Sequence, residues 1–380
     1  MGRSHKNRNA ELAVVGGGIL GLAHALVAAR DGRSVVLFER HPEARGASVR
    51  NFGMIWPISQ PLGSLRARAL RGREVWLEVA RETGIWHDAC GSLHLAYWRE
   101  ELDVLEEFHS SASAAEFPTE MLRPDQVLEL SPGVRMEGLL GALRSPAELC
   151  VDPREAIAAI PRWLEEKHGV TLRFGTPVLG IDPPMVETAE ESWQVERVVV
   201  CSGDDFETLY PEVFRDAGLT RCKLQMMRTG RQPDDWAMGP MLADGMSFLG
   251  YPSFRSCGSL AALLERTRRE RAEDLRQGIQ AKVSQNGRGQ VTIGDSHELG
   301  ISVSEDRSAA LDRSILHGLR RFLTVPELEI GERWIGVYVK HPQIADLVVA
   351  PNDEVRVVSV CTGSGMTLAF GLAEEVWAAW

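Results

Sequence analysis

The sequence predicts an α/β protein, α+β overall, in which a doubly wound lobe with a parallel sheet carries an inserted lobe with an antiparallel sheet. Three observations predict this arrangement. An apolar run, a glycine-rich turn at 16–21 and a helical pattern follow one another near the N-terminus. A second glycine turn at 363–365 precedes the final helical segment. Between them, strand-like segments at 224–229, 246–251, 279–285 and 290–293 indicate an antiparallel sheet.

The N-terminal turn reads Gly16-Gly17-Gly18-Ile19-Leu20-Gly21 and follows the apolar run 12–15. Gly16 allows a tight turn, Gly18 lets a pyrophosphate approach the backbone, and Gly21 lets the helix pack close to the strand. The pyrophosphate would lie at the helix N-terminus, where free N–H groups and the helix dipole favour negative charge. The turn, with Ile19 and Leu20 opening the helix, is therefore a predicted dinucleotide site.

A second strand, 34–38, ends in Glu39, about 20 residues past the glycines, where a ribose hydroxyl needs an acceptor. This pattern does not separate NAD from FAD. Turn formers and small residues dominate the loop that follows, up to Ser48, and loops after parallel strands carry ligand contacts. Arg50 and Asn51 stand in an otherwise uncharged stretch, so Arg50 is a candidate ligand contact.

Composition limits the classes of function. The chain has 380 residues, is 44% apolar and carries a formal net charge of −11, which argues against a nucleic-acid partner. Its six cysteines form no Cys-x-x-Cys motif and do not cluster with histidine, so no metal site is expected and a reducing cytoplasm is favoured. No apolar run has transmembrane length, and residues 1–9 are expected to be a flexible leader.

The remaining elements follow from local patterns. Asp152 and Pro153 predict a helix start, and Gly169 its end. Helices are expected at 64–83, 99–108, 121–130, 153–168, 309–322 and 367–380, with a solvated helix or long connection at 263–277. Further extended segments are expected at 91–97, 138–143, 170–174, 177–181, 195–201, 335–340 and 356–360. The nucleotide-binding lobe is expected to comprise 10–62, 140–215 and 335–380, and the substrate lobe 63–139 and 216–334.

Together these pieces resemble the FAD-dependent oxidoreductases of the glycine, sarcosine and D-amino-acid oxidase type. The first turn with Glu39 and Arg40 resembles that family's adenosine and pyrophosphate site. The stretch 46–54 resembles its segment beside the flavin ring, and 362–367 its C-terminal flavin turn. In addition to the first glycine turn, Glu39 and Arg40, the resemblance implies that a larger set of residues contacts FAD. These are Ser48, Arg50, Asn51, Phe52, Gly53, Met54, Pro177, Val178, Ser202, Gly203, Gly336, Gly363, Ser364, Gly365, Met366 and Thr367.

A narrower resemblance points to one subgroup. The strings 50–57, 284–286 and 294–298 are similar to FAD oxidoreductases associated with bacterial phosphonate catabolism. That subgroup is linked to oxidation of 2-aminoethylphosphonate or its N-methyl form. The resemblance therefore implies a small anionic amine as substrate.

The sequence also departs from the wider family. Amino-acid oxidases of this type grip the substrate carboxylate with an Arg in a Trp-x-Gly-x-Arg string, and Tyr338 stands at that position here. Gly336 stands where sarcosine-type enzymes carry the Cys that binds flavin covalently, so non-covalent FAD is expected. Thr367 stands where those enzymes have a C-terminal Lys. An ordinary α-amino acid is therefore a doubtful substrate.

The resemblance implies hydride transfer from a neutral amine to flavin N5, followed by hydrolysis of the imine to an aldehyde. Arg50, Tyr338, Lys340 and His297 are the candidate catalytic residues; Tyr338 and Lys340 lie two apart on a predicted strand and so share a face. Two alternatives stay open: a glycine, sarcosine or D-amino-acid oxidase, and a non-catalytic FAD-binding redox protein. The choice between oxygen and another electron acceptor, and the oligomeric state, stay open as well.

Overall fold

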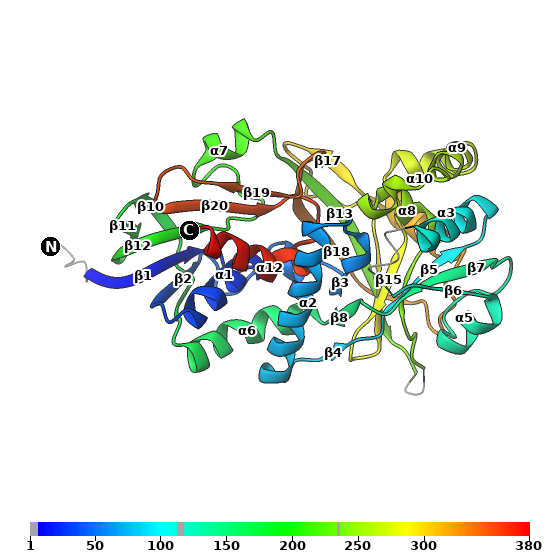
Figure 1. Ribbon diagram of the computed structural model, residues 1–380, viewed down its shortest axis with the longest axis horizontal. Coiled ribbons are helices and arrows are strands. Elements are labelled where there is room, and N and C mark those ends of the chain that lie inside the picture. The colour runs from blue at the N-terminus through cyan, green and yellow to red at the C-terminus, as the bar shows by residue number, and fades with distance from the viewer. Residues whose placement is uncertain (1–6, 112–117, 234–235) are drawn as a thin grey trace.

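The computed structural model describes residues 7–111, 118–233 and 236–380. Two large sheets lie toward opposite ends of the long axis of the molecule (Figure 1). The first sheet has a parallel centre, in the order β20-β12-β1-β2-β9. Its strands are β1 (Asn7–Val15), β2 (Val35–Glu39), β9 (Thr171–Phe174), β12 (Ser192–Val200) and β20 (Val355–Val360), with β10 (Val178–Asp182), β11 (Met185–Thr188) and β19 (Asp346–Val349) added antiparallel.

Helices cover one face of this sheet. The apolar side chains of Leu12, Val14 and Leu37 point into a core shared with four helices. These are α1 (Ile19–Arg30), α2 (Ser64–Thr83), α6 (Pro153–His168) and α12 (Gly365–Ala378). The opposite face packs against α7 (Pro211–Asp216) and the loop before it. The predicted α/β class is confirmed, with a sheet of mixed orientation.

The second sheet is almost entirely antiparallel, as expected, apart from a parallel pair between β5 and β14. Its strands are β5 (Ser92–Ala96), β6 (Glu120–Leu122), β7 (Gly141–Ser145), β13 (Thr220–Arg231), β14 (Met241–Ala243), β15 (Lys282–Gln285), β16 (Gln290–Gly294), β17 (Glu298–Gly300) and β18 (Ile330–Lys340). The helices of this half are α3 (Arg99–Ser110), α5 (Pro124–Leu130), α8 (Gly245–Gly250), α9 (Leu260–Glu270), α10 (Ala272–Arg276) and α11 (Ala309–Leu319). A small sheet of β3 (Met54–Ile55), β8 (Leu149–Val151) and β4 (His87–Asp88) lies between the two halves.

Local signals placed several helices correctly. The Asp152 side chain accepts hydrogen bonds from the Arg154 and Glu155 amides, and Gly169 ends α6 in the left-handed region, as the sequence predicts. The strand expected at 246–251 is wrong, because this segment forms α8. The helix expected at 121–130 is shorter, because residues 120–122 pair with β7 as β6.

The predicted boundaries between the lobes differ from the observed sheets in three places. Strand β7 and all of β18 pair within the second sheet, although 140–215 and 335–380 were expected in the nucleotide-binding lobe. Helix α2 was expected in the substrate lobe, yet its residues Val75, Trp76 and Val79 pack into the core of the first sheet. In each case local pattern predicted the element, and long-range packing decided its partner.

Residues 7–9, which were expected to belong to a flexible leader at 1–9, form part of a strand. Residues 7–9 extend β1 along β12, where Arg8 forms an ion pair with Glu191 at 3.0 Å and lies over the Trp193 ring. Residues 1–6 lie outside the described residues. Within the described ranges, no helix combines the length and the apolar character needed to cross a membrane.

Candidate functional site

A cavity of about 1680 Å³ is lined by segments of both halves of the molecule. The start of α1, the end of β2 and the loop 40–54 contribute to it, together with β18 and the turn before α12. All the sequence-predicted site residues line this cavity except Gly53. Gly53 has a φ of +75°, and a Cβ there would lie 1.9 Å from the Val151 carbonyl oxygen, so it fixes the loop against β8 instead.

The first glycine turn is built by close backbone approaches. Gly16 has a φ of +112°, and a Cβ there would lie 2.2 Å from the Cys201 carbonyl oxygen. A Cβ on Gly21 would lie 1.9 Å from the Gly16 carbonyl oxygen. Gly18 has extended backbone that any residue can adopt, and its missing side chain leaves space beside Ser48 Oγ. The first and last glycines therefore shape the turn, and Gly18 keeps the cavity open.

Side chains around this turn hold their positions through hydrogen bonds. Glu39 Oε2 accepts from the Gly17 amide at 2.9 Å, and Oε1 accepts from the His41 amide at 3.0 Å. Arg40 forms an ion pair with Asp205, near the predicted Ser202–Gly203 contact. The Glu39 carboxylate is thus fixed at the cavity edge, with acceptor capacity left for a ribose.

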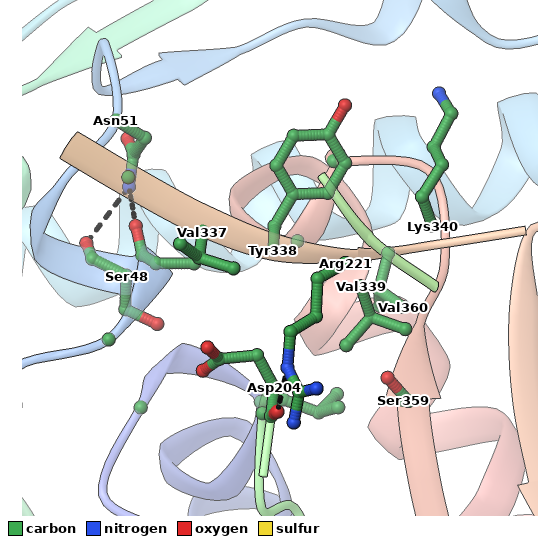
Figure 2. A pocket seen from close by; sticks show the side chains of 18 of the residues that line it. Ser48, Asn51, Asp204, Arg221, Val337, Tyr338, Val339, Lys340, Ser359 and Val360 are labelled. Carbon is green, nitrogen blue, oxygen red and sulfur yellow. Dashed lines mark hydrogen bonds between the residues drawn. The ribbon is translucent and has the colours of Figure 1, made fainter. Parts of the chain in front are cut away.

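The loop after β2 is organised by Asn51. Its Nδ2 donates to the carbonyls of Ala47 and Ser48, each at 2.9 Å, and its Oδ1 accepts from the Gly53 amide at 2.7 Å (Figure 2). Ser48 Oγ in turn accepts from the Ile19 amide at 3.0 Å. The Asn51 amide is therefore engaged within the loop, and it acts on the cavity by holding the loop against the start of α1.

The second glycine turn faces the same cavity. Gly363 has a φ of +78°, and a Cβ there would lie 2.8 Å from Tyr338 Cζ. The Thr367 hydroxyl accepts from the Trp56 amide at 2.9 Å, so this side chain also fixes the cavity wall. Ser364, which precedes α12, makes no capping hydrogen bond, and the first turn of α12 has no acidic residue.

Helix α1 also begins without a capping side chain at Gly18 and without an acid in its first turn. Two helix N-termini, neither with an acidic residue in its first turn, thus line one cavity, although Glu39 and Ser48 already accept hydrogen bonds from the Gly17 and Ile19 amides beside α1. A dinucleotide with an anionic centre fits this arrangement, because the glycine cradle leaves room where a Cβ would intrude. The residues present are therefore suited to FAD.

Comparison with known protein families shows which family the chain belongs to. The family described as "FAD dependent oxidoreductase" (DAO) matches residues 11–379. The chain belongs to this family. FAD, the predicted cofactor, is the cofactor of this family.

Individual relatives of this flavoprotein are distant. Glycine oxidase of Geobacillus kaustophilus is 28% identical over 208 residues, 51% of this chain and 54% of the relative. D-amino-acid oxidase of Streptomyces coelicolor is 42% identical over 78 residues, 20% of this chain and 24% of the relative. The matches thus span about half or less of these curated relatives.

Solved structures share the fold. Glycine oxidase from Geobacillus kaustophilus superposes with a TM-score of 0.77 at 20% identity, covering 98% of this chain and 94% of that structure. L-proline dehydrogenase from P. horikoshii gives a TM-score of 0.75 at 20% identity, covering 98% and 93%. At these identities the likeness establishes the architecture.

Strand β18 carries the pair that the sequence placed on one face. Tyr338 and Lys340 point to the same side of the strand, and Val337 and Val339 to the other (Figure 2). The Lys340 ammonium lies 5.9 Å from the centre of the Tyr338 ring. Burial raises the pKa of the Tyr338 hydroxyl well above its usual value and lowers the pKa of Lys340. Tyr338 is thus a hydroxyl donor at neutral pH.

His297 lines the same region in a fixed orientation. Its Nδ1 lies 2.7 Å from the Gly278 carbonyl oxygen, and its Nε2 lies 3.8 Å from Asp295 Oδ2. Burial lowers the pKa of His297 below its ordinary value, although the Asp295 carboxylate opposes this. A neutral ring that donates from Nδ1 to the carbonyl leaves Nε2 as an acceptor.

Arg50 lines the cavity and is hydrogen-bonded to strand β18. Its guanidinium donates to the Ile335 carbonyl at 3.1 Å, and its own carbonyl accepts from Trp334 Nε1 at 3.2 Å. A Cβ on Gly336 would lie 3.0 Å from the Arg50 carbonyl oxygen. Arg50 therefore fastens the loop to β18. Burial raises the pKa of the half-buried Asp204, and the positive charges of Arg221 and Arg50 oppose this rise.

The structure adds cavity residues that the sequence did not single out. Lys282 of β15, Asp295 after β16 and Arg255 of the short helix η3 (Pro252–Ser256) line the cavity with Lys340. In the sequence, the position of the charged residue Lys282 within a predicted strand was the signal that could have indicated these cavity residues. In the described residues, no group of three or more His, Cys, Asp or Glu side chains is arranged to hold a metal ion.

Gly18→Val is expected to abolish FAD binding without unfolding the protein. The valine fits the extended backbone at this position, yet it fills the space beside Ser48 that the cofactor needs. The flavin-to-protein absorbance ratio should fall at least about tenfold, with the far-UV circular dichroism of an unliganded wild-type sample. The control is Gly180→Val on β10, where the nearest atom to an added Cβ is 3.8 Å away. Normal flavin content in Gly18→Val would contradict the assignment.

Acid precipitation of the purified protein should release all of its flavin as FAD. Position 336 offers no thiol for a covalent bond, and Glu39 stands ready for the ribose that FMN lacks. Chromatography of the supernatant and the colour of the pellet provide the measurement. A yellow pellet, or FMN alone in the supernatant, would contradict the prediction.

Proposed function

We propose that this chain oxidises a small amine that carries an anionic group, and that the substrate is 2-aminoethylphosphonate or its N-methyl form. The observation that carries the proposal is the Tyr338–Lys340 pair beside Gly363. It puts a hydroxyl and an ammonium where amino-acid oxidases resembling this chain carry an arginine. FAD, when bound, supplies the two-electron acceptor for oxidation of the amine to an imine, which water hydrolyses to the aldehyde.

The chain's residues bind and orient the substrate in this proposal. The Lys340 ammonium and the Tyr338 hydroxyl donate hydrogen bonds to phosphonate oxygens. Because both groups are partly buried in the cavity, each bond forms where the dielectric is lower than in bulk water and is stronger than at the surface. The Tyr338 ring contacts the Gly363 turn, so a substrate held by this pair lies next to the predicted flavin segment.

The reacting nitrogen must be unprotonated. Neutral His297, with Nε2 as an acceptor, is the group in this region that can take a hydrogen bond from the amine. We propose this positioning role for His297. The six cysteines are free thiols, which supports the cytoplasm as the compartment of this activity.

A second candidate, oxidation of glycine, sarcosine or a D-amino acid, is favoured by the names of relatives such as the glycine oxidase above and human sarcosine dehydrogenase, which is 28% identical over 208 residues. The absence of an arginine at position 338 argues against it, because a planar carboxylate is best held by a bidentate guanidinium.

Anaerobic mixing with substrate should bleach the flavin. We expect 2-aminoethylphosphonate or its N-methyl form to reduce it faster than glycine, sarcosine or D-alanine does. The rate should rise with pH as the neutral fraction of the amine increases. Faster reduction by one of the three amino acids would overturn the phosphonate assignment and support the second candidate. Failure of every amine would mean that the protein binds FAD without oxidising amines.

Lys340→Met should lower kcat/KM for 2-aminoethylphosphonate about tenfold to a hundredfold, because a charge-assisted hydrogen bond is worth about 1.5–3 kcal/mol. Flavin content should stay normal. Lys167→Met, an exposed lysine in the last turn of α6, is the matched control and should leave both quantities unchanged. An unchanged kcat/KM in Lys340→Met would remove this residue from the substrate site.

A further inference from the structure

A second lysine lies on the wall of the cavity with Lys340. Lys282 of β15 extends over two aromatic rings, with its ammonium 5.6 Å from the centre of Phe52 and 5.8 Å from that of Tyr251. Its side chain is only 12% exposed. Two acceptors hold the ammonium loosely: Gln280 Oε1 at 3.4 Å and Asp295 Oδ1 at 3.5 Å. Lys282 is therefore ordered in the cavity with donor capacity left over.

Arg255 adds a third cation near the same point. It lies on η3, next to the segment that carries Tyr251, and it lines the cavity. The positive charges of Lys282 and Arg255 both lower the pKa of Lys340, and the Asp295 carboxylate raises it. These groups are thus close enough to act on one another electrostatically.

The charges in this group do not balance. Lys282, Lys340 and Arg255 carry three positive charges, and Asp295 carries one negative charge. Among the described residues, neither Lys340 nor Arg255 has a carboxylate within 4.0 Å. Nearby His297 adds no positive charge, because burial keeps it neutral. Lys282 and Lys340 are partly buried and Arg255 is exposed at the cavity wall, so a net excess of two positive charges remains, and a ligand with two negative charges would neutralise it.

We propose that Lys282, Lys340 and Arg255 form a subsite for a dianionic head group, and that Lys282 sets the preference for a dianion over a monoanion. The proposal rests on the proposed function, in which this cavity binds an anionic amine. A phosphonate carries two negative charges once it has lost its second proton, which happens near or above neutral pH, whereas a carboxylate or a sulfonate carries one. Asp295 neutralises one of the three positive charges. The subsite therefore has a net charge of +2, which complements a ligand with two negative charges.

The test compares three amines with the same two-carbon spacing: 2-aminoethylphosphonate, 2-aminoethanesulfonate and 3-aminopropanoate. In the wild-type holoenzyme, anaerobic flavin reduction should favour the phosphonate over the sulfonate by at least about a hundredfold in kcat/KM. Lys282→Met should lower the phosphonate value about tenfold to a hundredfold and change the monoanion values less than about threefold. Lys282→Arg should restore most of the loss, and Lys167→Met should behave as wild type.

A second measurement separates this inference from the proposed function. Methylphosphonate carries the same head group without an amine. It is used at an alkaline pH at which it is a dianion, and its binding is followed by the shift that it causes in the flavin absorbance spectrum. Its Kd should rise at least about tenfold in Lys282→Met and in Arg255→Met, a variant at an exposed position that should keep normal flavin content.

The outcomes are distinct. If no amine reduces the flavin but methylphosphonate binds in a Lys282-dependent way, the subsite stands and the proposed function fails. If the phosphonate is oxidised while Lys282→Met lowers all three amines equally, or leaves methylphosphonate binding unchanged, the subsite is overturned and the proposed function stands. Should Lys282→Met lose flavin, the Arg255→Met titration alone decides between these results.

Discussion

The architecture of the site depends on the contact between the Gly16 carbonyl and the α-carbon of Gly21, where no side chain would fit. This contact sets how steeply α1 leaves the first sheet, and therefore where its N-terminal dipole end points. Helix α12 packs along α1 and begins at the same cavity. The two helices share an apolar core, so both positive dipole ends are held together by packing behind the site.

Local sequence patterns predicted the turns and helices because their causes are local. A cap such as Asp152, a left-handed glycine and a strand that ends in Glu39 all act within a few residues. The strand expected at 246–251 is wrong because a short run of apolar residues fits either a strand or a helix. This segment forms a helix that packs beside α9 and η3, and its own sequence does not indicate that packing.

Like the fold, the candidate site could be predicted from the sequence only in part. Sequence motifs predict both glycine turns, and the described structure brings these turns to one cavity. Side-chain hydrogen bonds could not be predicted from the motifs: Asn51 binds its own loop, and Arg50 binds the backbone of β18. Lys282 and Arg255 come from segments 27 positions apart in the sequence, and only the folded second sheet and η3 place them near Lys340.

The contact between Tyr338 and Gly363 links the two halves of the molecule in one more respect. The aromatic ring occupies the volume that any side chain at position 363 would need, and Lys340 pairs by a backbone bridge with Thr362 next to it. The residues at 338 and 363 are therefore not free to vary independently during divergence. A lineage that exchanges the tyrosine for a smaller residue gains room at the second glycine turn by the same step, and a lineage that keeps the ring must keep the glycine.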